Sequence, residues 1–289
     1  MADVAVSILS AHACRLGEGS TYDAASDGAW WFDILERRLF RAHIGTGEVE
    51  SHALPVMGSA LCFIDDAHQL IAADDGLYVR ELAGGRLTLH TPLEADNAAN
   101  RSNDGRVHPC GALWIGTMGR EAEPGAGAIY HFFEGTLRRL YGGISIPNAI
   151  CFSPDGATAY FTDTSTAMLC RVAVDPLTGL PLGEPAMLYD HRGGEGGLDG
   201  AVVDAQGLIW NARWDGACLD VYTPEGARVR TIALPARRPT CPAFVGRGYD
   251  RLLVTSAAHG LDDGAPQGCT FLLDVGARGR PEPRVRMAS

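Results

Sequence analysis

The chain has 289 residues, of which 46% are hydrophobic and 20% are charged, and its formal net charge is −11 at pH 7. This composition supports a packed interior and argues against a disordered chain. The negative charge disfavours nucleic acid and anionic membranes as partners. There is no run of eighteen apolar residues that would predict a membrane span, and the first residues lack the basic segment of a signal peptide.

The eight cysteines are spread along the chain, and no two of them form a C-x-x-C pair. Cys62, Cys110 and Cys151 occupy apolar segments, where a free thiol behaves as a small hydrophobe. Such spacing is typical of reduced thiols and not of a disulfide or zinc framework. We therefore expect free cysteines and a cytoplasmic location.

A short apolar strand recurs about every 40–50 residues, which is the period of β-propeller blades. The clearest copies are residues 151–160 and 201–210, and weaker copies begin near Trp30, Leu70, Trp114 and Leu253. Each blade is too small to bury both of its faces, so neighbouring blades must supply the core. Six copies predict an all-β, six-bladed β-propeller that forms a single domain over residues 1–289.

Alternation of apolar and polar residues predicts strands at 77–82, 128–133, 169–174 and 218–223, each followed by a turn that contains glycine. No segment has a helical apolar face over three turns. The nearest candidate is the asparagine-rich stretch 93–103, and its polarity predicts a loop. We expect residues 4–9 to pair with the last blade and close the ring.

Four segments carry more polar residues than turns require: L-G-E-G at 16–19, N-R-S-N-D-G at 100–105, I-P-N-A at 146–149 and E-G-G-L-D-G at 195–200. Glu18, Asn148 and Asp199 precede three different predicted strands, so in a ring they can point at one axis. Alone, each of them could simply belong to a turn. Together, two carboxylates and one amide oxygen suit calcium, magnesium or manganese better than structural zinc or copper.

Other chemistries find little support in the sequence. None of the serines lies in a G-x-S-x-G elbow, and the glycine-rich segment around residue 195 lacks the spacing of a dinucleotide site. The nine histidines show no metal-binding spacing, and His12, His43 and His52 read as surface or strand residues.

In this order, the motifs resemble the SMP-30/gluconolactonase/LRE-like family, six-bladed propellers that include regucalcin and bacterial sugar lactonases. The motifs are L-G-E-G at 16–19, N-R-x-N-D-G at 100–105, W-x-G-T-M at 114–118, P-N-A-x-x-F-S-P-D-G at 147–156 and D-G-A-V-V-D at 199–204. The resemblance covers nearly the whole chain. The chain departs from it at Leu198, where many members have proline, and in a shortened lid segment at 262–271.

The resemblance implies that Glu18, Asn148 and Asp199 hold one divalent metal ion, which could be calcium, zinc, manganese, magnesium or iron(II). It also implies that Arg101, Asn103 and Glu121 bind the substrate, with Glu123 as the alternative to Glu121.

The implied reaction is hydrolysis of an aldonolactone, such as glucono-, xylono-, arabinono- or galactonolactone, with Asp199 as general base. The implied partner is thus a small sugar lactone, and we expect a monomer or homodimer. Two alternatives are a calcium-binding propeller scaffold without catalysis and a hydrolase of other esters, including organophosphates. Arg101 and Asn103 favour the lactonase, because a structural ion needs no donors for sugar hydroxyls beside it.

Overall fold

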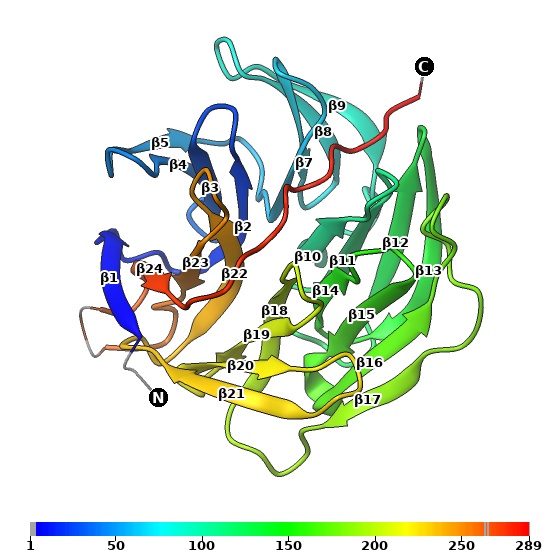
Figure 1. Cartoon of the computed structure of the whole chain (residues 1–289). Helices are drawn as coiled ribbons and strands as arrows, with labels where there is room; N and C mark the ends of the chain where they lie inside the picture. Colours follow the sequence, from blue (N-terminus) through cyan, green and yellow to red (C-terminus); the bar gives the residue numbers. More distant parts are fainter. Residues whose placement is uncertain (1–3, 263, 265, 289) are drawn as a thin grey trace.

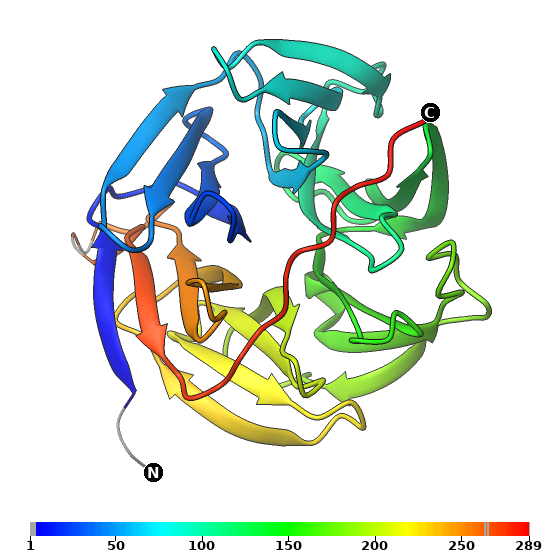
Figure 2. The same cartoon turned by 45° about the horizontal axis from the view of Figure 1, so that its top comes forward.

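Six four-stranded antiparallel sheets form the fold of the computed structural model, which describes residues 4–262, 264 and 266–288. The sheets are arranged as blades around a central axis (Figures 1 and 2). The prediction of an all-β, six-bladed propeller is confirmed. Apart from strands, the described residues contain one named element, the 3-10 helix η1 (Thr164–Thr166). Within the same residues, no helix has the length and apolar character needed to cross a membrane.

Five blades consist of four strands that are consecutive in the chain. The first contains β2 (Gly17–Asp23), β3 (Gly28–Asp33), β4 (Arg38–His43) and β5 (Val49–Ala53), and the second contains β6 (Ala60–Phe63), β7 (His68–Ala72), β8 (Gly76–Glu81) and β9 (Leu87–Pro92). The third contains β10 (Asn100–Val107), β11 (Leu113–Gly119), β12 (Gly127–Phe133) and β13 (Thr136–Ile144). The fourth contains β14 (Pro147–Phe152), β15 (Thr158–Asp163), β16 (Met168–Ala173) and β17 (Ala186–Asp190). The fifth contains β18 (Gly197–Val203), β19 (Ile209–Trp214), β20 (Cys218–Tyr222) and β21 (Arg228–Ala233).

The sixth blade joins the two ends of the chain. It combines β22 (Pro239–Val245), β23 (Arg251–Ser256) and β24 (Thr270–Asp274) with the N-terminal strand β1 (Ala5–Ser10). The ladder between β1 and β24 runs from Ala5 opposite Asp274 to Ser10 opposite Thr270. The predicted N-terminal pairing is therefore confirmed, and it closes the ring without leaving the edge of β24 open.

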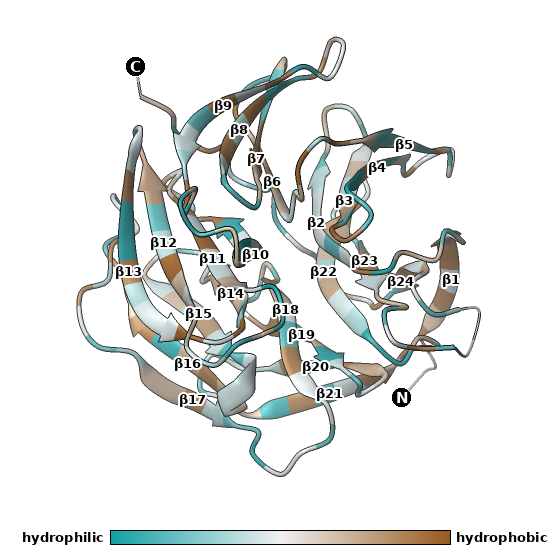
Figure 3. Cartoon of the chain, turned by 180° about the vertical axis from the view of Figure 1, so that it is seen from behind, coloured by the Kyte–Doolittle hydropathy of each residue, from teal (hydrophilic) through white to brown (hydrophobic). Residues whose placement is uncertain are grey.

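The hydrophobic core is distributed around the ring, between neighbouring blades. In β12, Tyr130 and His131 separate apolar residues on either side, and Figure 3 shows such hydrophilic and hydrophobic bands along several strands. At one blade contact, Trp210 and Leu219 of the fifth blade pack in one cluster with Phe244 and Leu252 of the sixth. Each blade thus buries one face against the next, which is how a propeller shares its core among small sheets.

The innermost strand of five blades carries the same irregularity in its pairing. The register shifts fall at 18–21 in β2, 102–105 in β10, 148–151 in β14, 198–201 in β18 and 239–242 in β22. A bulge of this kind bends a strand and re-aims its side chains, often beside an active site. The four polar segments found in the sequence lie at or beside four of these shifts.

Some details of the predicted elements are wrong. The stretch 93–103 is not a loop throughout, because its last four residues belong to β10. Its first strand residue, Asn100, gains partners there: Nδ2 donates to Glu94 Oε2 (2.7 Å) and to the Ala126 carbonyl (2.9 Å). Asn148 and Asp199 lie inside the strands that they were predicted to precede, and Glu18 lies in β2, a strand ahead of the copy predicted near Trp30. In the shortened segment 262–271, residues 263 and 265 lie outside the described residues.

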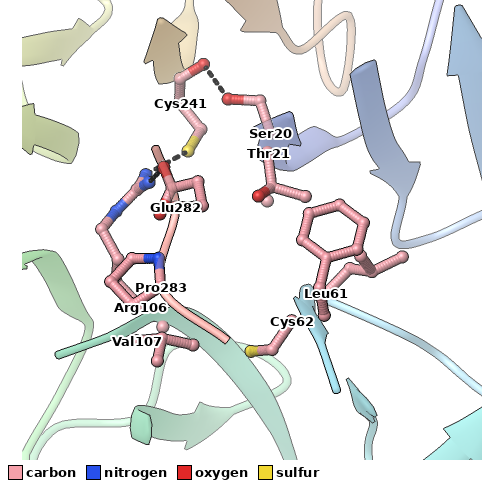
Figure 4. A pocket seen from close by; sticks show the side chains of 12 residues that line it. Ser20, Thr21, Leu61, Cys62, Arg106, Val107, Cys241, Glu282 and Pro283 are labelled. Atoms are coloured by element: carbon pink, nitrogen blue, oxygen red, sulfur yellow. Dashed lines mark hydrogen bonds and ion pairs between the residues drawn. The ribbon is translucent and has the colours of Figure 1, made fainter. Parts of the chain in front are cut away.

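Residues 275–288, here called the C-terminal strap, cross one mouth of the central channel (Figure 2). Glu282 of the strap forms an ion pair with Arg106 on β10 (Oε1–Nη1 2.6 Å), and the backbone N–H of Val285 donates to Phe63 (2.8 Å). Glu282 and Pro283 lie beside Arg106 and the inner strands at this end of the channel (Figure 4). The cavity left beneath the strap has about 10 Å³, enough for about one water molecule.

Candidate functional site

The six site residues implied by the family resemblance line a single cavity of about 480 Å³. Four of the six blades supply them, through β2, β10, β14, β18 and the loop that follows β11. Five of the six are buried, and Glu121 is exposed at the cavity. Glu123 does not line the cavity, so of the two glutamates it is Glu121 that the fold places there. The strand β2 begins at this cavity and runs toward the strap, so the two ends of the channel differ.

A chain of hydrogen bonds joins the polar residues of three blades. Arg101 Nη1 donates to Asn103 Oδ1 (2.8 Å), and Asn103 Nδ2 donates to Asn148 Oδ1 (3.0 Å). Asn148 Nδ2 then donates to Thr164 Oγ1 (3.0 Å), whose hydroxyl donates to the Leu198 carbonyl (2.7 Å). These contacts fix the orientation of the Asn148 amide before any ligand arrives, which is the preorganisation that a binding site needs.

Burial dominates the electrostatics of the acidic residues. It raises the pKa of Glu18 and that of Asp199, and nearby carboxylates raise both further. Burial also raises the pKa of Asp104, the neighbour of Asn103, to about 6. The Arg101 guanidinium is buried as well, which lowers its pKa to about 10. Three carboxyl groups held together out of water favour their neutral forms unless a cation compensates them.

The donor set fits a divalent cation. Glu18 and Asp199 offer carboxylate oxygens, and Asn148 offers an amide oxygen, which are the ligands of hard cations. Asn148 Oδ1 accepts one hydrogen bond from Asn103, and a carbonyl oxygen has a second lone pair that remains for another partner. A bound cation would also favour the ionised forms of two carboxyl groups that burial disfavours.

Unusual backbone conformations hold two of these residues in place. Gly19 and Ala149, which follow Glu18 and Asn148, have φ values of 61° and 54°, in the left-handed region. At Gly19, a β-carbon would collide with the carbonyl oxygen of Ser59, so only glycine fits. Ala149 is fully buried in a conformation that costs a non-glycine residue free energy. Such strain persists only where the surrounding structure imposes it.

Asp104 is a residue of the site that the sequence did not single out. It lies in the N-R-S-N-D-G segment on β10, and its Oδ2 accepts a hydrogen bond from the backbone N–H of Ile150 on β14 (2.7 Å). The Asp104 carboxylate therefore supports the strained backbone next to Asn148 from the neighbouring blade. Its position in a polar segment was the only sequence signal for this role.

Other residues that line the cavity carry no motif, and apart from Trp214 at the end of β19 the following ones come from loops between strands. They are Arg15, Leu35, Arg120, Trp214 and His259, among others. Arg120 is held by Asp74 of the second blade (Nη2–Oδ2 2.8 Å). The Arg238 guanidinium lies over the Trp214 ring, 4.7 Å from its centroid. These loops shape the mouth of the cavity, which is where selectivity among substrates arises.

A second group of potential metal ligands does not fit a metal ion. The ligand atoms of His12, Cys14 and Asp33 lie within 4.8 Å of one another. However, the Asp33 carboxylate already accepts hydrogen bonds from three backbone N–H groups at 2.8–3.3 Å. Burial raises the pKa of the Cys14 thiol, which disfavours the thiolate that binds metals. All eight cysteines are free, as the sequence predicted.

Comparison with known proteins identifies the family. The model of the SMP-30/Gluconolactonase/LRE-like region matches residues 16–258. A Rhizobium meliloti protein that is provisionally named a sugar lactone lactonase is 53% identical over 96% of both chains, and the 6-deoxy-6-sulfogluconolactonase of Pseudomonas putida is 32% identical over 93% of this chain and 94% of its own. A crystal structure of regucalcin, a calcium-binding protein from Agrobacterium tumefaciens, is 51% identical and superposes with a TM-score of 0.96 over 99% of this chain and 100% of its own. The resemblance read from the motifs is confirmed, and the chain belongs to the SMP-30/gluconolactonase/LRE-like family.

Proposed function

We propose that this protein is a divalent-metal-dependent hydrolase of sugar lactones. The observation that carries the proposal is that Glu18, Asn148 and Asp199 line one cavity with Arg101 and Glu121. The names of relatives that match nearly the whole chain support it, since they include a 6-deoxy-6-sulfogluconolactonase and a pentonolactonase of Haloferax volcanii.

The roles of the residues follow from their chemistry. Glu18, Asn148 and Asp199 would hold the cation, which when bound supplies Lewis-acid stabilisation of the lactone carbonyl oxygen. Arg101 offers a fixed hydrogen-bond donor for the hydroxyl groups of the sugar, and exposed Glu121 offers an acceptor. A site built to pair with substrate hydroxyls discriminates strongly against analogues that lack them.

Asp199 acts as the general base. Its carboxylate takes a proton from the attacking water, whose oxygen forms a bond to the carbonyl carbon. As the bond between this carbon and the ring oxygen breaks, Asp199 returns the proton to the ring oxygen. The product is the open-chain aldonic acid, and Asp199 is again ionised. Asn103, with both ends of its amide bonded to protein groups, positions Asn148 and Arg101 in this scheme.

A panel of aldonolactones and metal ions tests the proposal. Metal-stripped protein is restored with calcium, zinc, manganese, magnesium or iron(II), and acid release is followed with a pH indicator. We expect turnover of at least one aldonolactone only with added metal, and a loss of about 100-fold or more in kcat for Asp199→Asn. Exposed Asp96→Asn is the control and should retain wild-type turnover. Equal turnover by metal-free protein, or by Asp199→Asn, contradicts the proposal.

A second candidate function is calcium binding without catalysis. It is favoured by the similar structure whose name describes a calcium-binding protein. The same panel separates the two functions: calcium that binds and stabilises the protein without turnover of any lactone supports the second. Other esters and organophosphates, included as further substrates, test the remaining hydrolase alternative.

A further inference from the structure

A second cavity, of about 330 Å³, lies between the first and second blades, away from the proposed active site. Register places Trp30 on β3 opposite Arg41 on β4, and Gln69 on β7 opposite Arg80 on β8. The guanidinium carbons of Arg41 and Arg80 both lie 5.4 Å from the centroid of the Trp30 ring. The two blades thus bring an aromatic ring and two cations together in a contact whose other buried residues, such as Phe32 and Ile71, are apolar.

The acidic residues around this cavity already have partners. Asp23 accepts hydrogen bonds from two backbone N–H groups in the turn that follows it. The remaining acids each face a basic side chain, in the pairs Glu50–Arg41, Asp65–His68 and Asp66–Arg284. Glu50 also favours the charged form of Arg80, but in the described part of the chain none of these acids forms an ion pair with it.

Arg80 differs from the paired charged residues around the cavity because it has no ion-pair partner within the described residues. It is 3% exposed, and its side chain donates to Gln69 Oε1 (Nη1, 2.9 Å), with no carboxylate within 4.0 Å in the described part of the chain. Gln69 Nε2 and Trp30 Nε1 are also buried and lack a hydrogen-bond partner within the described residues. A buried cation without a counterion and two unpaired donors cost free energy unless a ligand supplies acceptors.

Tryptophans at two other blade contacts have partners for their indole N–H groups. Trp114 Nε1 donates to the Gly179 carbonyl (2.9 Å), and Trp210 Nε1 donates to Asp204 Oδ2 (3.0 Å). Arg230 lies over the Trp210 ring at 5.8 Å, but its guanidinium donates to the Val275 carbonyl (2.7 Å). Trp31 Nε1, at the contact with the sixth blade, is buried and unpaired as well within the described residues. What distinguishes the cavity between the first two blades is that the unpaired donors of Trp30 and Gln69 line it together with Arg80.

We propose that this cavity binds a small monocarboxylate. A guanidinium matches the two oxygens of a carboxylate, and the Gln69 amide beside it adds a further donor. Arg80 has no ion-pair partner among the described residues, and the four acids that line the cavity disfavour a dianion such as inorganic phosphate more than a monoanion. Phe63, Leu82 and the Trp30 ring form the apolar part of the wall, which suits a short hydrocarbon body.

Nuclear magnetic resonance of the indole N–H groups tests the proposal on the wild-type protein. The chain has five tryptophans, and Trp30→Phe identifies the Trp30 signal by its loss. Titration with sodium butyrate should move the Trp30 signal in a saturable way and leave those of Trp114 and Trp210 in place. The proposal is overturned if the Trp30 signal does not move, or if sodium chloride at the same ionic strength moves it equally.

Thermal unfolding of variants gives an independent measurement. At a butyrate concentration a hundredfold above Kd, the Tm of the wild-type protein should rise by about 4 °C. Arg80→Met should lose this rise, whereas the matched control Arg230→Met, which removes the guanidinium over Trp210, should keep it. An equal rise in Arg80→Met, or an equal rise with inorganic phosphate, overturns the proposal. If Arg80→Met does not fold, Gln69→Leu serves instead, with a reduced rise expected.

Discussion

At the scale of single residues, the candidate site places three buried carboxyl groups, those of Glu18, Asp104 and Asp199, near one axis. Motifs identified the first and the last, because residue type and order along the chain are visible in a sequence. The sequence could not show that Asp104 bonds to the backbone of the next blade, or that Thr164 supports Asn148. Those roles depend on contacts between blades, which a single sequence does not reveal.

These carboxyl groups predict how stability depends on pH in the metal-free protein. Because burial raises their pKa values, to about 6 for Asp104 and about 8 for Glu18, the folded state holds protons that the unfolded state releases. Their contribution to stability is complete below about pH 4 and is lost as pH rises toward 8. Asp104 alone accounts for on the order of 3 kcal/mol. We expect added divalent cation to raise the Tm more at pH 8 than at pH 5.

The measurement is thermal unfolding of metal-stripped protein between pH 4 and pH 8, with and without the cation. A Glu18→Gln/Asp199→Asn double variant should show a flatter pH dependence and little response to the cation. If the double variant keeps the wild-type slope, these two residues are not the source of the effect.

At the scale of elements, the short helix η1 positions a residue that connects two blades. Thr164 accepts from Asn148 and donates to Leu198, the neighbour of Asp199. Thr164→Val keeps the size of the side chain and removes both hydrogen bonds. We expect the affinity for the divalent cation to fall by about 10-fold, as is typical when a group that orients a metal ligand is lost. Isothermal titration calorimetry measures this affinity directly.

Two further variants distinguish a role of Thr164 in positioning Asn148 from a general disturbance of the helix η1. Thr164→Ser should restore most of the affinity, because the hydroxyl returns. Thr166→Val changes an exposed threonine of the same helix, whose hydroxyl donates to the carbonyl of Asp163 at the end of β15, and should bind the cation as the wild type does. A loss of affinity in Thr166→Val as large as in Thr164→Val would mean that the helix as a whole matters and not the contact with Asn148.

Sequence patterns predicted the strands well and the bulges not at all. Alternation of apolar residues is a property of one strand, so segments such as 128–133 were found where β12 lies. A bulge is a property of two paired strands, because it appears only when their registers are compared. For this reason the innermost strands start earlier than predicted, and the end of the stretch 93–103 was assigned to a loop although it belongs to β10.

At the scale of the whole molecule, the C-terminal strap ties the last blade to the second, third and fourth. Glu282 and Arg106 form its most buried ion pair, with side chains 16% and 9% exposed. Glu282→Ala leaves the Arg106 charge without its partner, so the free energy of unfolding should fall by about 3 kcal/mol. Urea denaturation measures the change.

The exposed pair Arg286–Glu134 of the same strap provides the control, since Glu134→Ala should cost less than about 1 kcal/mol. Replacing both members of the buried pair, in Arg106→Met/Glu282→Leu, should recover much of the loss. Equal effects of Glu282→Ala and Glu134→Ala would show that burial does not strengthen the contact.

The number of blades was predictable from the repeat period, but the strap was not, because its residues follow no blade pattern.

The strap also decides how molecules move through the protein. The strap covers one mouth of the channel, and the cavity beneath it, of about 10 Å³, has no room for a sugar. We therefore expect a compound that binds beside Asp199 to enter and leave at the other end, past Arg120, Trp214 and His259. The loops at that end of the channel would then control both the binding of substrate and the release of product.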